Sequence, residues 1–307
     1  PLYNSADSSL LLIEQVYKYL KYTNDNEFIK DEIYPSLVKI MDAYSDRIDV
    51  DGDNIYLDKE DNLLSAGTEN TQITWMDVKI DNHAITPRNG KTVELNALWY
   101  NALKIMEELS GEFGDDSLEY ENLANKVKSS FNERFWNEEK SCLYDVVDEN
   151  DDKIRPNQIW AVSLPFSILD IEKEKKIVNT VYKHLYATYG LRSLSFMDKE
   201  YKSKYIGKLF DRDCAYHMGT TWGFLIGGFI TAYCKVNNYS DLAIKKANHM
   251  CKVFEDTMND GCINGIAEIF DGDFACTGRG CYSQAWSVAE VLRAYSQDVL
   301  PYLNKFH

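Results

Sequence analysis

Helical periodicity runs through almost the whole chain and constrains its fold more than any other feature. Apolar residues recur three and four positions apart, which is the spacing that places them on one face of an α-helix. The 307-residue sequence shows this pattern repeatedly and shows little of the strict alternation that marks strands. We therefore predict an all-α fold with about nine helices, at residues 8–23, 26–46, 93–110, 116–136, 157–170, 172–187, 217–236, 239–258 and 283–299.

These helices are of two kinds, which differ in how their apolar residues are distributed. The helices that are apolar nearly all round are 93–110, 157–170, 217–236 and 283–299. The helices that carry Lys and Glu on one face are 116–136, 172–187 and 239–258. Because a helix that is apolar all round is buried and an amphipathic one lies outside, this alternation predicts two concentric rings. The long loops at 47–92, 137–156, 188–216 and 259–282 would gather at one end and form a site.

The first of these loops contains a short pattern of a different kind. Residues 47–57 alternate apolar and polar side chains around Gly52, which predicts a small β-hairpin. Asp49, Asp51, Asp53 and Glu60 have the spacing of carboxylates in a calcium loop. The glycine is misplaced for such a loop and the flanking residues resemble strand, so an acidic, solvated turn is favoured over calcium.

Charge and cysteine usage exclude several classes of function. The chain has 33 Lys and Arg against 49 Asp and Glu, a net charge of −16. This charge repels polyphosphate and anionic lipid, so we expect neither nucleic acid nor a membrane surface as partner. Residues 214–234 lack charged side chains, but the polar His217 and Thr220 near their start favour a buried helix over a membrane span.

The seven cysteines are odd in number and show no Cys-x-x-Cys spacing. This usage predicts reduced thiols in a cytoplasmic protein. We expect no metal and no cofactor.

Two carboxylates stand out for their surroundings. Asp77 lies beside the indole of Trp75, shortly before a helix whose first turn carries polar residues among apolar ones. Glu268 lies between apolar neighbours in a glycine-rich loop, where a desolvated carboxyl can hold a proton or act as a strong base. Since glycoside cleavage requires two carboxyl groups, Asp77 and Glu268 are the predicted catalytic pair.

Five ordered motifs, which together span nearly the whole chain, carry a family resemblance. They are Thr74–Asp77, Thr86–Leu103, Arg155–Pro165, Tyr189–Ser195 and Arg212–Trp222. They resemble the C-terminal amylo-α-1,6-glucosidase domain of glycogen debranching enzymes. Met218 and Gly223 stand where the family's pattern has Gln and Pro, and neither is part of the predicted acid and base.

The resemblance implies a single (α/α)6 toroid over residues 1–307. It also implies a glycosidase of carbohydrate metabolism that hydrolyses α-1,6-linked glucosyl stubs on glycogen or branched α-glucans with inversion. By the resemblance Asp77 corresponds to the general acid and Glu268 to the base, and inversion predicts carboxyl groups about 6.5–9.5 Å apart.

Further residues of the motifs are candidates for substrate binding. Indole rings can stack on a sugar, guanidinium groups can bind hydroxyls or orient carboxylates, and Glu94 and Asn96 can bind hydroxyls or cap their helix. Ordinary core packing and structural ion pairing are the alternatives for these residues. The candidates are Trp75, Arg88, Glu94, Asn96, Trp99, Arg155, Asn157, Gln158, Trp160, Arg192, His217, Thr221 and Trp222.

Two alternatives to this function stay open. One is another exo-acting α-glycosidase, trehalase-like or glucoamylase-like, and the other is a glucan-binding module without catalysis.

The helix count carries an expectation about the length of the protein. A toroid of this kind needs twelve helices, so about nine helices and a first residue other than Met predict a C-terminal fragment that is incomplete at its N-terminus. Apolar faces near Leu10, Ile13, Val288 and Leu292 would then be uncovered and would favour self-association.

Overall fold

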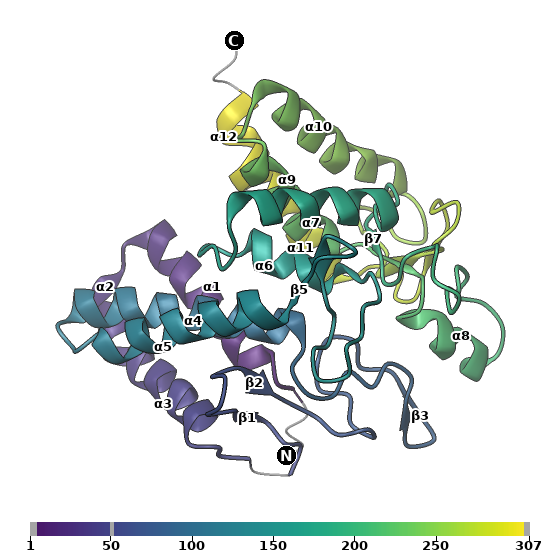
Figure 1. Ribbon diagram of the computed structural model, residues 1–307. Helices are drawn as coiled ribbons and strands as arrows, with labels where there is room; N and C mark the ends of the chain where they lie inside the picture. The colour runs from purple at the N-terminus through teal and green to yellow at the C-terminus, as the bar shows by residue number, and fades with distance from the viewer. Residues whose placement is uncertain (1–4, 50–51, 304–307) are drawn as a thin grey trace. The chain divides into compact units, whose positions relative to one another are not determined.

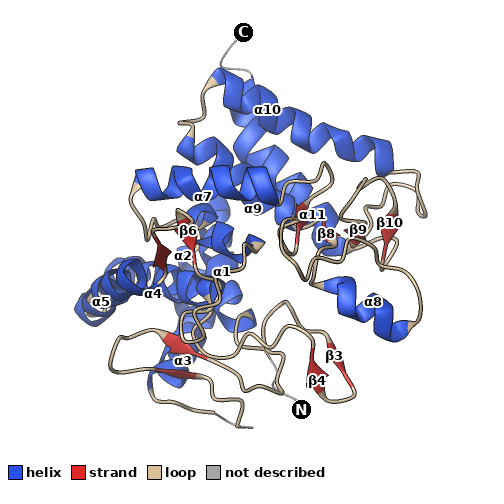
Figure 2. Cartoon of the chain, turned by 45° about the vertical axis from the view of Figure 1, so that its right-hand side comes forward, coloured by secondary structure: helices blue, strands red, loops and turns tan. Residues whose placement is uncertain are grey.

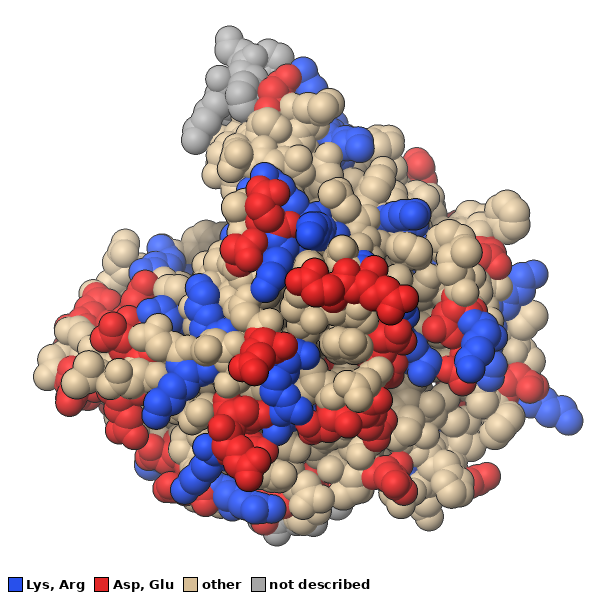
Figure 3. All heavy atoms as spheres, in the orientation of Figure 1, with Lys and Arg blue, Asp and Glu red and all other residues tan. Residues whose placement is uncertain are grey.

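The computed structural model describes residues 5–49 and 52–303. About 51% of the structure is helical and every strand is short, so the predicted fold class is confirmed (Figure 2). On the face shown in Figure 3, acidic and basic side chains are interspersed. The chain divides into two compact units. The first comprises residues 1–136, 144–151 and 164–169, and the second comprises 137–143, 152–163 and 170–307.

The first unit is built around one long buried helix. Helix α4 (Val93–Phe113) is buried without interruption from Val93 to Leu103, and it packs against α1 (Ser8–Thr23) and α5 (Leu118–Arg134) (Figure 1). The predicted helix 26–46 consists of α2 (Asn26–Phe28), a π-helical turn (Ile29–Ile33) and α3 (Tyr34–Ser45).

The exposed faces predicted for the terminal helices are only partly present. Leu10 and Ile13 of α1 are buried, at 1% and 0% exposure, so the prediction for them is wrong. Their helix packs on α4, which covers its apolar side. Val288 is half-buried, and Leu292 is 63% exposed, as predicted.

The first unit also contains two short hairpins. Strands β1 (Tyr56–Leu57) and β2 (Leu64–Ser65) form one, and β3 (Lys79–Ile80) and β4 (His83–Ala84) form the other. A hairpin near this place was predicted, but β1 pairs forward with β2 and not around Gly52.

The calcium-loop pattern has a local explanation in its first aspartate. The Asp49 carboxylate accepts hydrogen bonds from the backbone N–H groups of Asp53 and Asn54, at 3.1 and 2.9 Å, which forms a turn. Asp51 lies outside the described residues.

The second unit packs its helices around α9 (Leu225–Val236). This helix contacts α6 (Trp160–Ser163), α7 (Ile171–His184), α10 (Asp241–Lys252) and α11 (Ala285–Ala294). A 3-10 turn (Val253–Thr257) extends α10, and a π-helical turn (Tyr295–Val299) followed by α12 (Leu300–Leu303) extends α11. Strands β5 (Trp136–Asn137) and β6 (Cys142–Leu143) form a hairpin where the chain leaves the first unit.

Two predicted helices of this unit are much shorter than expected. The helix predicted over 157–170 consists of a 3-10 turn (Pro156–Ile159) and α6, which ends at Ser163, two residues before Pro165. A proline disfavours helical geometry in the residue before it, which accounts for this end. The helix predicted over 217–236 begins only at Leu225, because Thr221 and Trp222 form strand β8 and α8 (Leu209–Tyr216) ends just before His217.

No helix in the described part of the chain is long and apolar enough to cross a membrane. All seven cysteines are free, in agreement with the prediction of unpaired thiols.

Candidate active site

In the first unit, Asp77 lies in a segment whose backbone is held firmly. The N–H of Trp75 donates to Asp7 Oδ2 at 3.1 Å, and Thr86 Oγ1 donates to the carbonyl of the buried Met76 at 3.4 Å. Asp77 itself is exposed. An exposed carboxyl on a fixed backbone is suited to act on a ligand that comes from solvent.

Asp7 contributes to this segment and was not among the predicted site residues. It is the N-cap of α1, yet its carboxylate does not cap the helix and instead accepts from Trp75 and from Ser5 Oγ at 2.8 Å. Burial raises the pKa of Asp7 above its ordinary 3.8, and the hydrogen bonds oppose that rise. An acidic residue directly before an apolar helix predicts an N-cap, but its contact with Trp75 depends on tertiary packing.

A buried ionic cluster lies next to the start of α4. The Arg88 guanidinium donates to both oxygens of Glu94 and to both oxygens of Asp145, with Nη2 2.6 Å from Glu94 Oε2 and 3.0 Å from Asp145 Oδ1. All three side chains are buried. Burial alone would lower the pKa of Arg88, but Asp145 and Glu94 raise it above its ordinary value. Burial raises the pKa of Glu94 while Arg88 opposes the rise.

This cluster favours structural ion pairing for Arg88 and Glu94, one of the two alternatives for them. Asp145 was not predicted, because it lies in a loop of the sequence and only the fold brings it to Arg88.

Asn96 and Trp99 are both at 0% exposure, inside the first unit. The Asn96 amide accepts from the Leu64 N–H at 2.7 Å and donates to the Leu64 carbonyl at 3.0 Å, so it continues the hydrogen bonding of β2. Trp99 packs against Tyr44 with ring centroids 5.8 Å apart. Both residues therefore join α4 to its neighbours in the core.

In the second unit, a sheet of four very short strands gathers several predicted residues. Its order is β10 (Gly278–Arg279), β9 (Ile269–Phe270), β8 (Thr221–Trp222) and β7 (Leu191–Arg192), with all neighbours antiparallel. Arg192 pairs with Thr221, and Trp222 pairs with Ile269, the residue after Glu268. The sheet was not predicted, and it is what brings Glu268 to Arg192, Thr221 and Trp222.

The Glu268 carboxylate is partly exposed and is bound by neutral donors. The Cys281 backbone N–H donates to Oε2 at 3.0 Å, and Gln284 Nε2 donates to Oε1 at 3.3 Å. An ionised carboxylate has about four acceptor positions, so each oxygen keeps a position open for water or substrate.

The two predicted arginines of this unit bind backbone carbonyls. Arg155 is buried, and its Nη1 donates to the carbonyls of Ser193 and His217 at 3.0 and 2.7 Å. Arg192 Nε donates to the Gly272 carbonyl at 2.8 Å. These bonds hold the segment between β7 and β8 and the segment between β9 and β10.

His217 and Trp222 lie inside the unit, stacked with ring centroids 5.1 Å apart. The Trp222 indole N–H donates to the Tyr216 carbonyl at 2.9 Å. Asn157 is also buried, and the buried Gln158 accepts from the Leu143 N–H at 3.3 Å. All four side chains therefore belong to the buried interior of this unit.

Trp160 and Thr221 of the second unit each bury a polar atom without a hydrogen-bond partner in the described part of the chain. These atoms are the indole nitrogen of Trp160 and the hydroxyl of Thr221. Buried polar atoms are nearly always paired, so both are free to bind a ligand or water.

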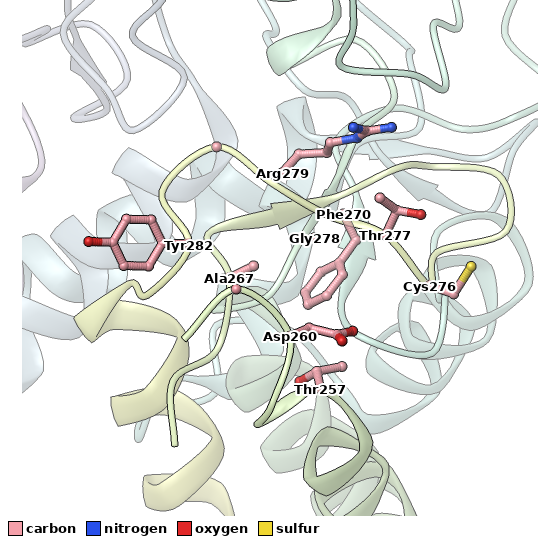
Figure 4. Close-up of a pocket in the computed structure, with 11 residues that line it drawn as sticks. Thr257, Asp260, Ala267, Phe270, Cys276, Thr277, Gly278, Arg279 and Tyr282 are labelled. Carbon is pink, nitrogen blue, oxygen red and sulfur yellow. The ribbon is translucent and has the colours of Figure 1, made fainter. Parts of the chain in front are cut away.

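A cavity of about 320 Å³ in the second unit is lined by Ala267 and Phe270, which lie on either side of Glu268 in the sequence (Figure 4). In this view Asp260 and Thr257 lie on one side of Phe270 and Arg279 lies on the other. Arg279 is bound to both oxygens of Asp271, at 3.2 and 3.1 Å. Gly280 forms part of the wall, and a Cβ atom there would lie 2.3 Å from Glu268 Oε2, so the cavity and the carboxylate flank the same glycine.

The structure thus brings the predicted residues together in two groups. Trp75, Asp77, Arg88, Glu94, Asn96 and Trp99 belong to the first unit. Arg155, Asn157, Gln158, Trp160, Arg192, His217, Thr221, Trp222 and Glu268 belong to the second. The predicted catalytic pair has one member in each unit, so both the pair and its carboxyl separation stay predictions. Within the described residues no group of three or more His, Cys, Asp or Glu could hold a metal ion.

Two comparisons with known proteins, one with a family and one with a single relative, agree with each other. The family described as amylo-alpha-1,6-glucosidase matches residues 1–293. The glycogen debranching enzyme of Saccharomyces cerevisiae is 22% identical over 92% of this chain, and the chain spans only 22% of that enzyme's length.

Solved structures of Thermus thermophilus proteins are similar at 14% identity. An uncharacterized conserved protein matches 69% of this chain and 47% of its own, with a TM-score of 0.51, and this likeness concerns the fold alone. A GH63 mannosylglycerate hydrolase in complex with Tris and D-glycerate matches 67% of this chain and 46% of its own, with a TM-score of 0.49.

Proposed function

Because this chain belongs to the amylo-α-1,6-glucosidase family of glycoside hydrolases, we propose that it removes α-1,6-linked glucosyl stubs from glycogen or related branched α-glucans. The name of the yeast relative supports glycogen as the substrate class. The net charge of −16 suits a neutral, hydroxyl-rich partner. The free cysteines support a reducing compartment, and we place the reaction in the cytoplasm.

In the proposed reaction Asp77 protonates the departing glycosidic oxygen and Glu268 removes a proton from the attacking water. Water then attacks the face of the sugar opposite the leaving group, which inverts the anomeric carbon.

One observation carries this proposal. Glu268 presents a partly exposed carboxylate that is held by two neutral donors and has no cation bound to it in the described part of the chain. A carboxylate in that state is not committed to a cation, and it retains acceptor positions for a water molecule.

The test is hydrolysis by single isosteric variants. Asp77→Asn removes the acid and Glu268→Gln removes the base, so each lowers glucose release from a glucosyl-branched limit dextrin by at least about 100-fold. Binding of the dextrin survives both changes. Near-normal turnover by either folded variant would refute the role of that residue.

Substrate comparison separates the alternatives. Glucose release from trehalose or from an α-1,4-linked glucan in preference to the limit dextrin would indicate another exo-acting α-glycosidase. Binding of the dextrin without hydrolysis of any of the three would indicate a glucan-binding module.

A further inference from the structure

Three residues of the segment 280–284 lie against the Glu268 carboxylate. The Cys281 N–H contacts Oε2, the Gln284 amide contacts Oε1, and the Gly280 backbone lies against Oε2. We propose that Gln284, together with the backbone of Gly280 and Cys281, positions Glu268 for water activation. This inference rests on the proposed role of Glu268 as the base.

The backbone of Glu268 is fixed before its side chain is considered. Its N–H donates to the Cys281 carbonyl at 2.9 Å, and its carbonyl accepts from the Gly223 N–H at 3.2 Å. Cys281 therefore accepts from the backbone of Glu268 and donates to its side chain. These bonds leave only the side-chain torsions of Glu268 free to set where its oxygens lie.

Gln284 is itself held in place at both of its backbone groups. It is the N-cap of α11, its carbonyl accepts from the Val288 N–H at 3.2 Å, and its N–H donates to the Ile266 carbonyl at 2.8 Å. Ile266 lies two residues before Glu268. The amide of Gln284 therefore starts from a fixed point and reaches Oε1 with little freedom to move away.

Gly280 allows this close approach, because any side chain would occupy the same space as the carboxylate. Its φ of +64° lies in the left-handed region, and a Cβ atom would lie 2.3 Å from Glu268 Oε2. Pairing of Arg279 with Ile269 places Gly280 across from Glu268. Any residue with a side chain at position 280 must therefore displace the Glu268 carboxylate.

Two neutral donors, one on each oxygen, orient the carboxylate. Tyr205 also lies within electrostatic range of Glu268, and burial raises its pKa, so it stays neutral over the range of an ordinary assay. The thiol of Cys281 points to the Ser283 carbonyl at 3.2 Å. Loss of the Gln284 donor should therefore impair the base itself more than the binding of substrate.

The first experiment compares Gln284→Ala with Gln284→Glu in hydrolysis of a limit dextrin. We expect kcat to fall about 10-fold in the alanine variant and further in the glutamate variant, whose charge repels that of Glu268. KM stays within about twofold, and the acidic limb of the pH profile moves to higher pH, because the ionised base has lost a donor. Gln15→Ala, an exposed glutamine of α1, serves as the control and leaves all three measurements unchanged.

The second experiment uses glycine variants. Gly280→Ala should lower kcat more than Gln284→Ala does, because it displaces the carboxylate. Gly114→Ala is its matched control, since Gly114 has a φ of +89° and open space around its Cβ position. Any cost of backbone strain appears in both variants, whereas only Gly280→Ala should impair turnover beyond its effect on thermal stability.

The outcomes separate this inference from the proposed function. If Glu268→Gln is inactive while Gln284→Ala keeps normal kcat and a normal pH profile, the positioning role is refuted and the base is retained. If Glu268→Gln keeps near-normal activity, the proposed role of Glu268 as the base is refuted, and the positioning role of Gln284 is refuted with it. A fall in stability without a change in kcat or in the pH profile would reduce Gln284 to a structural residue.

Discussion

The carboxylates of the Arg88 cluster and the carboxylate of Glu268 show two ways in which a protein can hold a negative charge. Glu94 and Asp145 are buried and share one guanidinium, whose positive charge offsets theirs within the fold. Glu268 is partly exposed and is bound by an amide and a backbone N–H. The first arrangement supports the fold around α4, whereas the second leaves a carboxylate able to act on a ligand. Burial and the charge of the partner therefore distinguish a structural carboxylate from a chemical one.

The largest expected effect is on stability, in the Arg88 cluster. Arg88→Met leaves two buried carboxylates without their cation, so we expect the free energy of unfolding to fall by about 3–5 kcal/mol. Arg134→Met is the matched control, because Arg134 also binds two carboxylates, those of Asp61 and Asp148, but is partly exposed and should cost about 1 kcal/mol or less. Urea denaturation measures both variants. Equal losses would end the distinction between the two kinds of site.

The next largest effect is expected at Glu268, where a substitution should lower activity and leave stability nearly unchanged. Glu268→Gln removes the charge but keeps the shape of the side chain, so its free energy of unfolding should stay within about 0.5 kcal/mol of the wild type. The proposed loss of activity, at least about 100-fold, corresponds to about 2.7 kcal/mol in the barrier. A large loss of stability would instead place Glu268 with the structural carboxylates.

The smallest expected effect concerns Asp7. Its carboxylate is buried, like those of the Arg88 cluster, but it accepts hydrogen bonds from neutral donors, as Glu268 does. Its pKa is raised by burial, so its contribution to stability is fully present below its ordinary 3.8 and is lost as the pH rises through the raised value. Asp7→Asn cannot ionise and can still accept from Trp75. The stability of the variant relative to the wild type should therefore increase from about pH 4 to pH 7 in urea denaturation. A decrease over that range would show that ionised Asp7 stabilises the fold.

Sequence periodicity predicted the helices better than the site. Helix α1 has the predicted bounds, and α4 exceeds its prediction only at its C-terminal end, because both have the 3.6-residue pattern of a long helix. Thr221 and Trp222 were assigned to a helix, since a short apolar run has the same composition in a buried strand. The sheet that contains them joins strands of two residues from distant parts of the chain, and such pairing leaves no local pattern.

The site residues divide in a similar way. Asp77 and Glu268 were predicted as the catalytic pair from their aromatic and apolar neighbours in the sequence, and this assignment stays a prediction. Asp145, Asp7 and Gln284 were missed, because their contacts with Arg88, Trp75 and Glu268 arise only when distant segments pack together. A contact partner of that kind has no signal in the spacing of a single sequence.

The stereochemistry of the first product tests the central claim most directly, namely that Asp77 and Glu268 act as acid and base on a water molecule. Proton NMR of a glucosyl-branched limit dextrin during early hydrolysis would distinguish the two anomers of released glucose. The account predicts that β-glucose appears first and then mutarotates. Early accumulation of α-glucose would contradict it, since retention requires a covalent intermediate and carboxyl groups only about 5–5.5 Å apart.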